Sequence, residues 1–356
     1  MPRLRNINFE NRFGRAHECL YLCNAMKYSI IIPVYNRPDE VEELLDSISH
    51  QQHHLEETEV IVVEDGSSLK CDKVVDLFRD RLNIKYYEKS NSGPGPSRNY
   101  GARKSTGEYL IILDSDTVLP PAYLEAIDRE LQSHPCDAFG GPDMAHKDFS
   151  PVQKAINYGM TSFFTTGGIR GGKKKLDKFY PRSFNMGIKR EVFDALKGFS
   201  NMRFGEDIDL SLRIFENGYE CRLFPSARLW HKRRTDLKKF FKQVYNSGIA
   251  RINLTKRHPG SLKIVHTLPA LFTIGSALMI VGMFFCKWSI VPLAAYALLI
   301  LTDASIKEKS LKTGGLAVAA SFVQLVGYGS GFIGAAWQRL VLKKGEYEAY
   351  RDTFYE

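Results

Sequence analysis

Two acidic side chains follow a buried apolar segment in the sequence YLIILDSD. The apolar run from Tyr109 to Leu113 is typical of a strand that is covered on both faces, as in a parallel sheet. Residues two apart in an extended chain point the same way, so we expect Asp114 and Asp116 to project together. Because two like charges repel, the pair predicts a divalent cation that bridges the protein and a diphosphate. A polar turn is the alternative.

Polar residues also follow the earlier expected strands. PVYN ends in Tyr35 and Asn36, EDGSS contains Asp65, and SRN places Arg98 at the front of a helix. Turn chemistry explains each of these motifs alone. Successive parallel strands, however, bring their carboxyl ends to one edge of a sheet. We therefore expect these side chains to meet Asp114 at that edge.

The elements that must position these residues alternate between strands and helices. Strand patterns occupy residues 28–35, 59–65, 83–89 and 109–113. Helical patterns lie between them at residues 37–51, 71–82 and 96–105. This alternation predicts an α/β fold with a mostly parallel sheet flanked by helices.

The second half of the sequence adds further candidates. The sequence FGEDIDLSL places Glu206, Asp207 and Asp209 where a helix begins. Acids complement the positive end of a helix dipole, but that role does not require an adjacent Glu-Asp pair after a glycine. His231 ends a strand-like run, LFPSARLWH, and can be either a structural histidine or a ligand.

The charge of the chain is concentrated in one segment. The sequence has 49 Lys and Arg against 40 Asp and Glu, and residues 232–263 hold ten of the bases and one of the acids. The rest of the chain is balanced, so the basic pI does not indicate a nucleic-acid-binding protein. Apolar runs follow at 264–286, 289–302 and 314–337, and lysine and arginine beside such runs indicate the cytoplasmic side of a membrane.

The N-terminus has no apolar core of the length that a signal peptide needs. We therefore expect the chain before the apolar runs to lie in the cytoplasm, held at the inner membrane by a multi-pass C-terminal region. Residues 1–26 are expected to be a disordered extension or the product of a start codon placed too far upstream. The six cysteines form no C-x-x-C pair, which favours reduced thiols in a cytosolic domain.

Taken in order, PVYN, EDGSS, SRN, LDSD, NMGIKREVF and GEDIDL resemble the motifs of family 2 glycosyltransferases of the GT-A fold. The resemblance covers Tyr28 to His231, over half the chain. It implies an inverting transferase with a nucleotide-diphospho-sugar donor, of UDP type, and Mn²⁺ or Mg²⁺ as cofactor.

The resemblance also implies roles for individual residues. The donor-binding residues would be Pro33, Tyr35, Asn36, Asp65, Arg98 and Asp114. The metal ligands would be Asp116, Asp114 and His231. Asp207 would be the catalytic base, with Glu206 beside it as the second catalytic candidate, and Asn185 and Met186 would lie on the acceptor side.

Two departures from the family pattern bear on function. Ser97 stands where the family often has alanine, a mild change. The Q-x-x-R-W motif of processive synthases is absent, since QVYNS begins at Gln243, and this favours single additions. The expected acceptor is a membrane lipid or a lipid-linked glycan. A nucleotidyltransferase and a non-catalytic membrane scaffold are the alternatives.

The expected organisation has five parts. They are an extension at 1–26, a GT-A domain at 27–232, a basic juxtamembrane segment at 233–263, two to three transmembrane helices at 264–337 and a tail at 338–356.

Overall fold

The computed structural model describes residues 27–144, 149–167, 179–232 and 234–346. The expected N-terminal extension, most of the glycine- and lysine-rich loop and the end of the tail lie outside the described residues.

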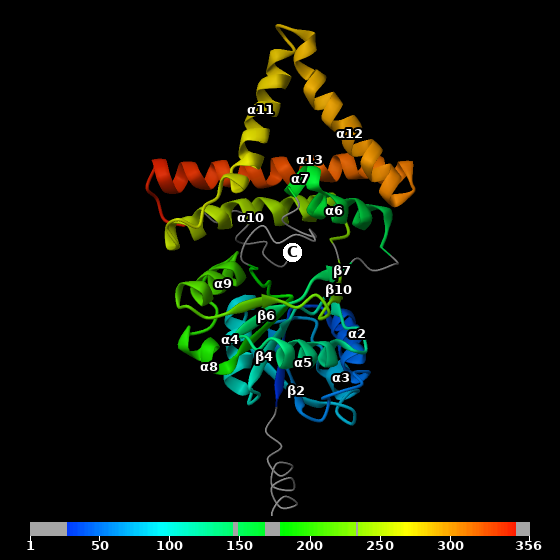
Figure 1. The fold of residues 1–356 in the computed structure, drawn as a ribbon, viewed down its shortest axis with the longest axis vertical. Coiled ribbons are helices and arrows are strands. Elements are labelled where there is room, and N and C mark those ends of the chain that lie inside the picture. Colours follow the sequence, from blue (N-terminus) through cyan, green and yellow to red (C-terminus); the bar gives the residue numbers. More distant parts are fainter. Residues whose placement is uncertain (1–26, 145–148, 168–178, 233, 347–356) are drawn as a thin grey trace, which may run out of the picture.

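A seven-stranded sheet forms the centre of the α/β domain (Figure 1). Its strands, in spatial order, are β3 (Asn83–Lys89), β2 (Thr58–Asp65), β1 (Tyr28–Val34), β4 (Tyr109–Leu113), β8 (Asn185–Lys189), β6 (Ala138–Gly140) and β9 (Cys221–Leu223). The first four strands are parallel, and β8 runs antiparallel to both of its neighbours. The mostly parallel α/β sheet predicted from the sequence is therefore confirmed.

Helices cover both faces of this sheet, because most strand residues are apolar on both sides. One core is built with α2 (Pro38–Ser49), α3 (Asp72–Asp76) and α5 (Tyr123–Ser133). The opposite core is built with α4 (Pro94–Lys104), α8 (Arg190–Ala195) and α9 (Glu206–Glu216). Strand β4 is buried along its whole length, as its continuous apolar sequence indicates.

A second, three-stranded sheet lies beside the end of β4. It consists of β5 (Thr117–Val118), β10 (Leu229–His231) and β7 (Asp143–Met144), with β10 in the middle. The β10–β5 register pairs His231 with Thr117. This pairing places His231 next to Asp116, which is 115 residues earlier in the chain.

The C-terminal third of the chain, together with residues 151–166, forms a separate layer of helices (Figure 1). Its members are α6 (Pro151–Thr161), α7 (Phe163–Thr166), α10 (Leu237–Arg257), α11 (Leu268–Gly282), α12 (Val291–Glu308), α13 (Leu311–Ala336) and the short turn Trp337–Val341. Helix α13 packs along α10 and α6, and α11 and α12 rise from it as two legs joined at their far ends.

Two segments are long and apolar enough to cross a membrane by length and composition, Lys287–Glu308 and Leu311–Val341. They correspond to the second and third apolar runs of the sequence. The first run, expected at 264–286, contains a helix of 15 residues, Leu268–Gly282, preceded by a 3₁₀ turn. About 20 helical residues are needed to cross a bilayer, so this leg is shorter than the sequence suggested.

Candidate functional site

The two aspartates of LDSD lie in a turn that directly follows β4. The strand ends at Leu113, and the hydroxyl of Thr117 closes the turn by donating to the carbonyl of Asp114 at 2.8 Å. The extended geometry expected for this pair is therefore wrong. The turn still brings the two carboxylates together, with a ligand atom of each within 4.8 Å of the other.

A candidate cation site is formed by Asp114, Asp116 and His231. One ligand atom from each residue lies within 4.8 Å of those of the other two. The imidazole of His231 stacks on Phe184, with ring centroids 4.7 Å apart, and its Nδ1 lies 3.9 Å from a carboxylate oxygen of Asp143. Packing and charge thus orient the histidine toward the aspartates.

One atom in this cluster is well suited to a cation. Asp116 Oδ1 is buried and, within the described part of the chain, has no hydrogen-bond partner, although His231 Nε2 lies 3.2 Å away outside hydrogen-bonding geometry. Burial alone raises the pKa of this carboxyl, but attraction to His231 and then to Arg234 and Arg37 lowers the pKa to about 2. Asp116 is therefore an anion with a free lone pair. Two carboxylates and an imidazole suit Mn²⁺ or Mg²⁺, so the residues fit the predicted metal.

A buried arginine connects this cluster to the start of α9. Arg98 donates to Asp114 Oδ1 at 2.7 Å and to Glu206 Oε1 at 2.8 Å, and its guanidinium lies 5.2 Å from the centre of the Phe199 ring. Its side chain is 4% exposed. In this conformation Arg98 fixes the spacing between two acids, and its predicted contact with the donor stays a prediction.

The acidic pair at the start of α9 has two different electrostatic environments. Asp207 Oδ2 accepts from Arg182 Nε at 2.6 Å, and Oδ1 accepts from the backbone N–H of Ile208 at 2.8 Å. Burial alone raises the pKa of Asp207, but Arg182 and Arg98 lower the pKa below its ordinary value. For Glu206, burial outweighs Arg98 and the pKa is raised. Of the two adjacent carboxyls, Asp207 therefore has the lower pKa.

The third acid of GEDIDL has a structural environment. Asp209 Oδ2 accepts a hydrogen bond from Arg213 Nε at 2.9 Å. Its other oxygen lies 2.9 Å from His258 Nε2, and Nδ1 of the same histidine lies 2.8 Å from Glu216. These contacts join α9 to the end of α10. Both carboxylate oxygens of Asp209 therefore have partners that fix α9 in place, and this environment suits a structural residue rather than a catalytic base.

The predicted donor-binding residues on the first two strands organise the loops at the sheet edge. Asp65 accepts from Lys89 Nζ at 2.5 Å and from the backbone N–H groups of Ser92 and Gly93 at 2.9 and 2.8 Å. Asn36 has a positive φ of 54°, and its side-chain oxygen Oδ1 accepts from the backbone N–H of Leu69 at 2.9 Å. These two residues tie the loops after β1, β2 and β3 to one another.

Four further predictions concern single side chains. Pro33 and Tyr35 are partly exposed at the end of β1, and their donor contacts stay predictions. Asn185 is buried, accepting from Tyr123 and donating to the carbonyl of Ala227. Met186 is fully buried in the core. In this conformation neither Asn185 nor Met186 presents its side chain to an acceptor, and their acceptor-side assignment stays untested.

The sequence argument missed Arg182 and Lys89. Arg182 precedes β8, and because β8 is antiparallel, its beginning lies beside the end of β4 with Asn185 opposite Leu113. The sequence does not show whether β8 is parallel or antiparallel, so it cannot predict at which edge of the sheet an arginine before that strand lies. Lys89, in contrast, ends β3, and the rule of converging strand ends could have included it.

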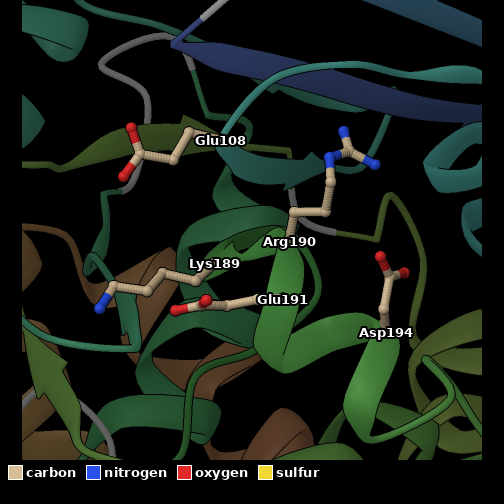
Figure 2. A pocket seen from close by; sticks show the side chains of 5 residues that line it. All are labelled: Glu108, Lys189, Arg190, Glu191 and Asp194. Carbon is tan, nitrogen blue, oxygen red and sulfur yellow. The ribbon is translucent and has the colours of Figure 1, made fainter.

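A separate surface hollow lies at the opposite end of the strands. Figure 2 shows its lining by Glu108, Lys189, Arg190, Glu191 and Asp194. The guanidinium of Arg190 donates to Gly107, Ala102 and Ser105, so its charge supports the loop before β4. This hollow is distinct from the cluster at the strand ends.

Comparison with known proteins agrees with this fold. The model of "Glycosyl transferase family 2" matches residues 29–197. Poly(ribitol-phosphate) beta-N-acetylglucosaminyltransferase TarS of Staphylococcus aureus is 30% identical over 144 residues, 37% of this chain and 25% of that protein. A probable glycosyltransferase of Sulfolobus acidocaldarius is 27% identical over 209 residues, 56% of this chain and 45% of that protein.

A solved structure extends the likeness to the C-terminal layer. Mannosyltransferase PcManGT from Pyrobaculum calidifontis, in complex with GDP-Man and Mn²⁺, superposes with a TM-score of 0.60 at 18% identity, covering 83% of this chain and 86% of that chain. At that identity the likeness shows the fold. Residues 29–197 of this chain belong to glycosyl transferase family 2, and the chain has the GT-A fold, as its motifs predicted. It spans between 13% and 53% of the lengths of the curated relatives it matches.

Proposed function

We propose that this protein transfers a sugar from a nucleotide-diphospho-sugar to a hydroxyl of a membrane-associated acceptor, with inversion at the anomeric carbon. The observation that carries the proposal is the buried, unsatisfied oxygen of Asp116 beside Asp114 and His231. Arg98 connects this cluster to Glu206, the neighbour of Asp207. This connection through Arg98 supports a cation site and a carboxylate base that act on the same donor.

The leaving-group side of the reaction is assigned to the strand-end cluster. Asp114, Asp116 and His231 would hold Mn²⁺ or Mg²⁺. The cation, when bound, would act as a Lewis acid that stabilises the negative charge of the departing diphosphate. Arg98 keeps Asp114 in position through its 2.7 Å hydrogen bond, so the ligand geometry exists before the donor arrives.

The attacking side is assigned to Asp207. The acceptor oxygen forms a bond to the anomeric carbon while the bond to the diphosphate breaks, and the acceptor proton passes to the Asp207 carboxylate. A single displacement from the far face inverts that carbon. The lowered pKa of Asp207 keeps it ionised at neutral pH. Its hydrogen bond to Arg182 fixes one oxygen and leaves that oxygen a second lone pair for the acceptor hydroxyl.

The acceptor is assigned from the C-terminal layer. The apolar helices and the basic segment at 232–263 suit a bilayer with anionic headgroups. A lipid or lipid-linked glycan at the cytoplasmic face of the inner membrane would therefore reach the site from that side. Single additions are favoured because the Q-x-x-R-W sequence of processive synthases is replaced by QVYNS.

The rival functions differ in what they predict. A nucleotidyltransferase would normally have a glycine-rich basic loop after β1, where this chain has PVYNRPDE. A non-catalytic scaffold would be expected to have lost an acid, yet Asp114, Asp116, Glu206 and Asp207 are all present. Membership of family 2 of the glycosyltransferases also argues against the first rival.

A donor screen tests the proposal. The full chain in detergent would be incubated with UDP- and GDP-sugars in Mn²⁺ or in EDTA, and released nucleotide would be measured. We expect nucleoside diphosphate from at least one donor in Mn²⁺, and its loss in EDTA and in Asp116→Asn. Formation of UTP or GTP together with sugar 1-phosphate, when pyrophosphate is added to the nucleotide-sugar, would support the nucleotidyltransferase instead. Absence of both donor binding and release for every nucleotide-sugar would contradict sugar transfer.

A further inference from the structure

Helix α10 is fixed to the catalytic domain. His258, which follows its last residue, lies 2.9 Å from Asp209 of α9. Near the middle of α10, the methyl group of Ala250 and the side chain of Leu254 pack against Gly205 at the start of α9. The orientation of α10 relative to the membrane therefore sets the orientation of the α9 end of the site.

Helix α13 is fixed along α10 by close backbone contact. A Cβ on Gly248 would lie 2.2 Å from the carbonyl oxygen of Tyr328, and one on Gly331 would lie 2.1 Å from that of Tyr245. Small residues allow this approach. After α13, Arg257 still bonds to Glu346 at 2.9 Å. The chain thus stays beside α10 from the second half of α13 to the end of the described residues.

The two legs α11 and α12 lie on the other side of α13 from the catalytic domain (Figure 1). Their surfaces are apolar and exposed, and the turn between them is the most exposed part, with Phe284 at 87%, Phe285 at 90% and Trp288 at 79%. The far end of α12 returns to the catalytic side, where Asp303 accepts from Tyr158 of α6 at 2.6 Å. The legs therefore form a hairpin whose two ends lie on the same side.

We propose that the α11–α12 hairpin enters the bilayer and returns, while α13 lies along the membrane surface against α10 and does not cross. By length α13 is the best candidate span, since 26 residues extend about 39 Å. A crossing α13 would, however, carry α10 into the hydrocarbon with it. Lys238, Lys239 and Lys256 of α10 are exposed, and each would be strongly disfavoured there.

The bilayer is the occupant that fits the hairpin. Both legs expose apolar side chains, and these are not confined to a single face of either helix. Examples are Leu271, Leu278 and Leu298. This pattern is expected of helices that contact lipid. An apolar hollow of about 380 Å³ opens where α11 leaves α13, lined by residues such as Ile274, Ile333 and Leu340. The lysines of α10 at the base of the hairpin complement anionic headgroups. The C-terminal end of the described chain is then on the catalytic side.

Cysteine labelling in sealed vesicles tests this topology. The full chain would be placed in vesicles with the catalytic domain outward and treated with a membrane-impermeant maleimide, and mass spectrometry would identify each labelled cysteine. Native Cys286 is exposed beside the hairpin turn. Leu262→Cys reports the position just before the hairpin, and Gly345→Cys, whose surroundings are open, reports the position after α13.

We expect Leu262→Cys and Gly345→Cys to be labelled in intact vesicles, and Cys286 to be labelled only after detergent is added. Labelling of Gly345→Cys only after detergent would establish a crossing α13 and overturn the proposal. Labelling of Cys286 in intact vesicles, or recovery of the chain in the soluble fraction, would show that the hairpin is not inserted and would also overturn it. None of these readouts requires sugar transfer, so failure of the proposed activity is distinguishable from failure of the topology.

Discussion

Four carboxylates at the site carry the same charge and have different surroundings. Asp116 has a buried free oxygen, Asp114 and Glu206 share Arg98, and Asp207 is bound to Arg182. Burial disfavours an isolated charge, so each acid depends on its own cation or donor. Single substitutions should therefore separate their roles.

The first prediction at this scale concerns the metal. Mn²⁺ bound to the folded state should raise the melting temperature of the wild-type protein, because a ligand of the native state at 100 times its Kd adds about 2.7 kcal/mol. Asp116→Asn should abolish this shift and the activity, since a neutral amide is a poor substitute for an anionic ligand. Thermal unfolding with and without Mn²⁺ measures it. Ser115→Ala is the control, and an unchanged Mn²⁺ shift in Asp116→Asn would remove this residue from the site.

The second prediction concerns the base. Asp207→Asn should keep the fold and the donor and metal binding, and lower turnover at least about a hundredfold, within the range of about 10²–10⁴ for general-base catalysis. Loss of helix-dipole complementation alone would cost about 0.3–1 kcal/mol of stability and leave turnover near normal. Turnover, donor affinity and melting temperature distinguish the two.

Glu206→Gln is the matched variant for the adjacent acid. Because Glu206 holds Arg98, which holds Asp114, its loss should weaken donor and metal binding more than Asp207→Asn does. If Glu206→Gln is inactive with normal donor binding while Asp207→Asn turns over normally, the base is Glu206.

At the scale of elements, the sheet and the C-terminal layer are joined through α9 and α10. The α9 helix begins with Glu206 and Asp207 and is held further along by a contact between His258 and Asp209. The adjoining α10–α13 contact depends on glycines that admit carbonyl oxygens. Packing of this kind tolerates no added atom where the neighbour is backbone.

A pair of glycines on α13 tests that packing. Gly331→Ala places a Cβ 2.1 Å from the Tyr245 carbonyl oxygen, so α13 must shift, at a cost of about 1–3 kcal/mol. Gly315→Ala meets nothing within 4 Å and should stabilise the helix by up to about 1 kcal/mol. Thermal unfolding in detergent should therefore change in opposite directions. A neutral Gly331→Ala would show that the two helices do not pack so closely.

At the scale of the whole molecule, stability should depend on acid pH through buried carboxylates. In Glu59, Asp128, Asp207 and Asp209, burial raises the pKa, but hydrogen bonds and nearby cations outweigh it and lower the pKa overall. A lowered pKa in the folded state contributes stability that is present above the unfolded pKa and is lost as pH falls through the folded pKa. Glu206, whose pKa is raised, acts in the opposite direction.

We therefore expect the free energy of unfolding to fall as pH is lowered, roughly from pH 5 downward. Urea unfolding in detergent at a series of pH values measures this. Asp128→Asn should be less stable than wild type at neutral pH and should show a shallower decline. A free energy that stays level down to pH 3 would contradict the assigned pairs.

The sequence alone determined the parallel part of the sheet and the candidate acids. Continuous apolar runs specify strands buried on both faces, and parallel strands necessarily end at one edge. The rule of shared strand ends was enough to group Asn36, Asp65, Asp114 and Asp116, but it did not predict the turn that holds the two aspartates of LDSD. His231 and Asp207 were assigned through the family motifs, since no local pattern places them beside β4.

Only the tertiary structure decided how the charges are paired and which apolar helix lies where. Arg182 reaches Asp207 because β8 is antiparallel, and His231 reaches Asp116 because β10 pairs with β5. Similarly, α13 has the length and composition of a span, yet it packs along a charged helix. Strand direction, pairing and helix packing depend on contacts between residues far apart in the chain, and such contacts leave no periodicity in the sequence.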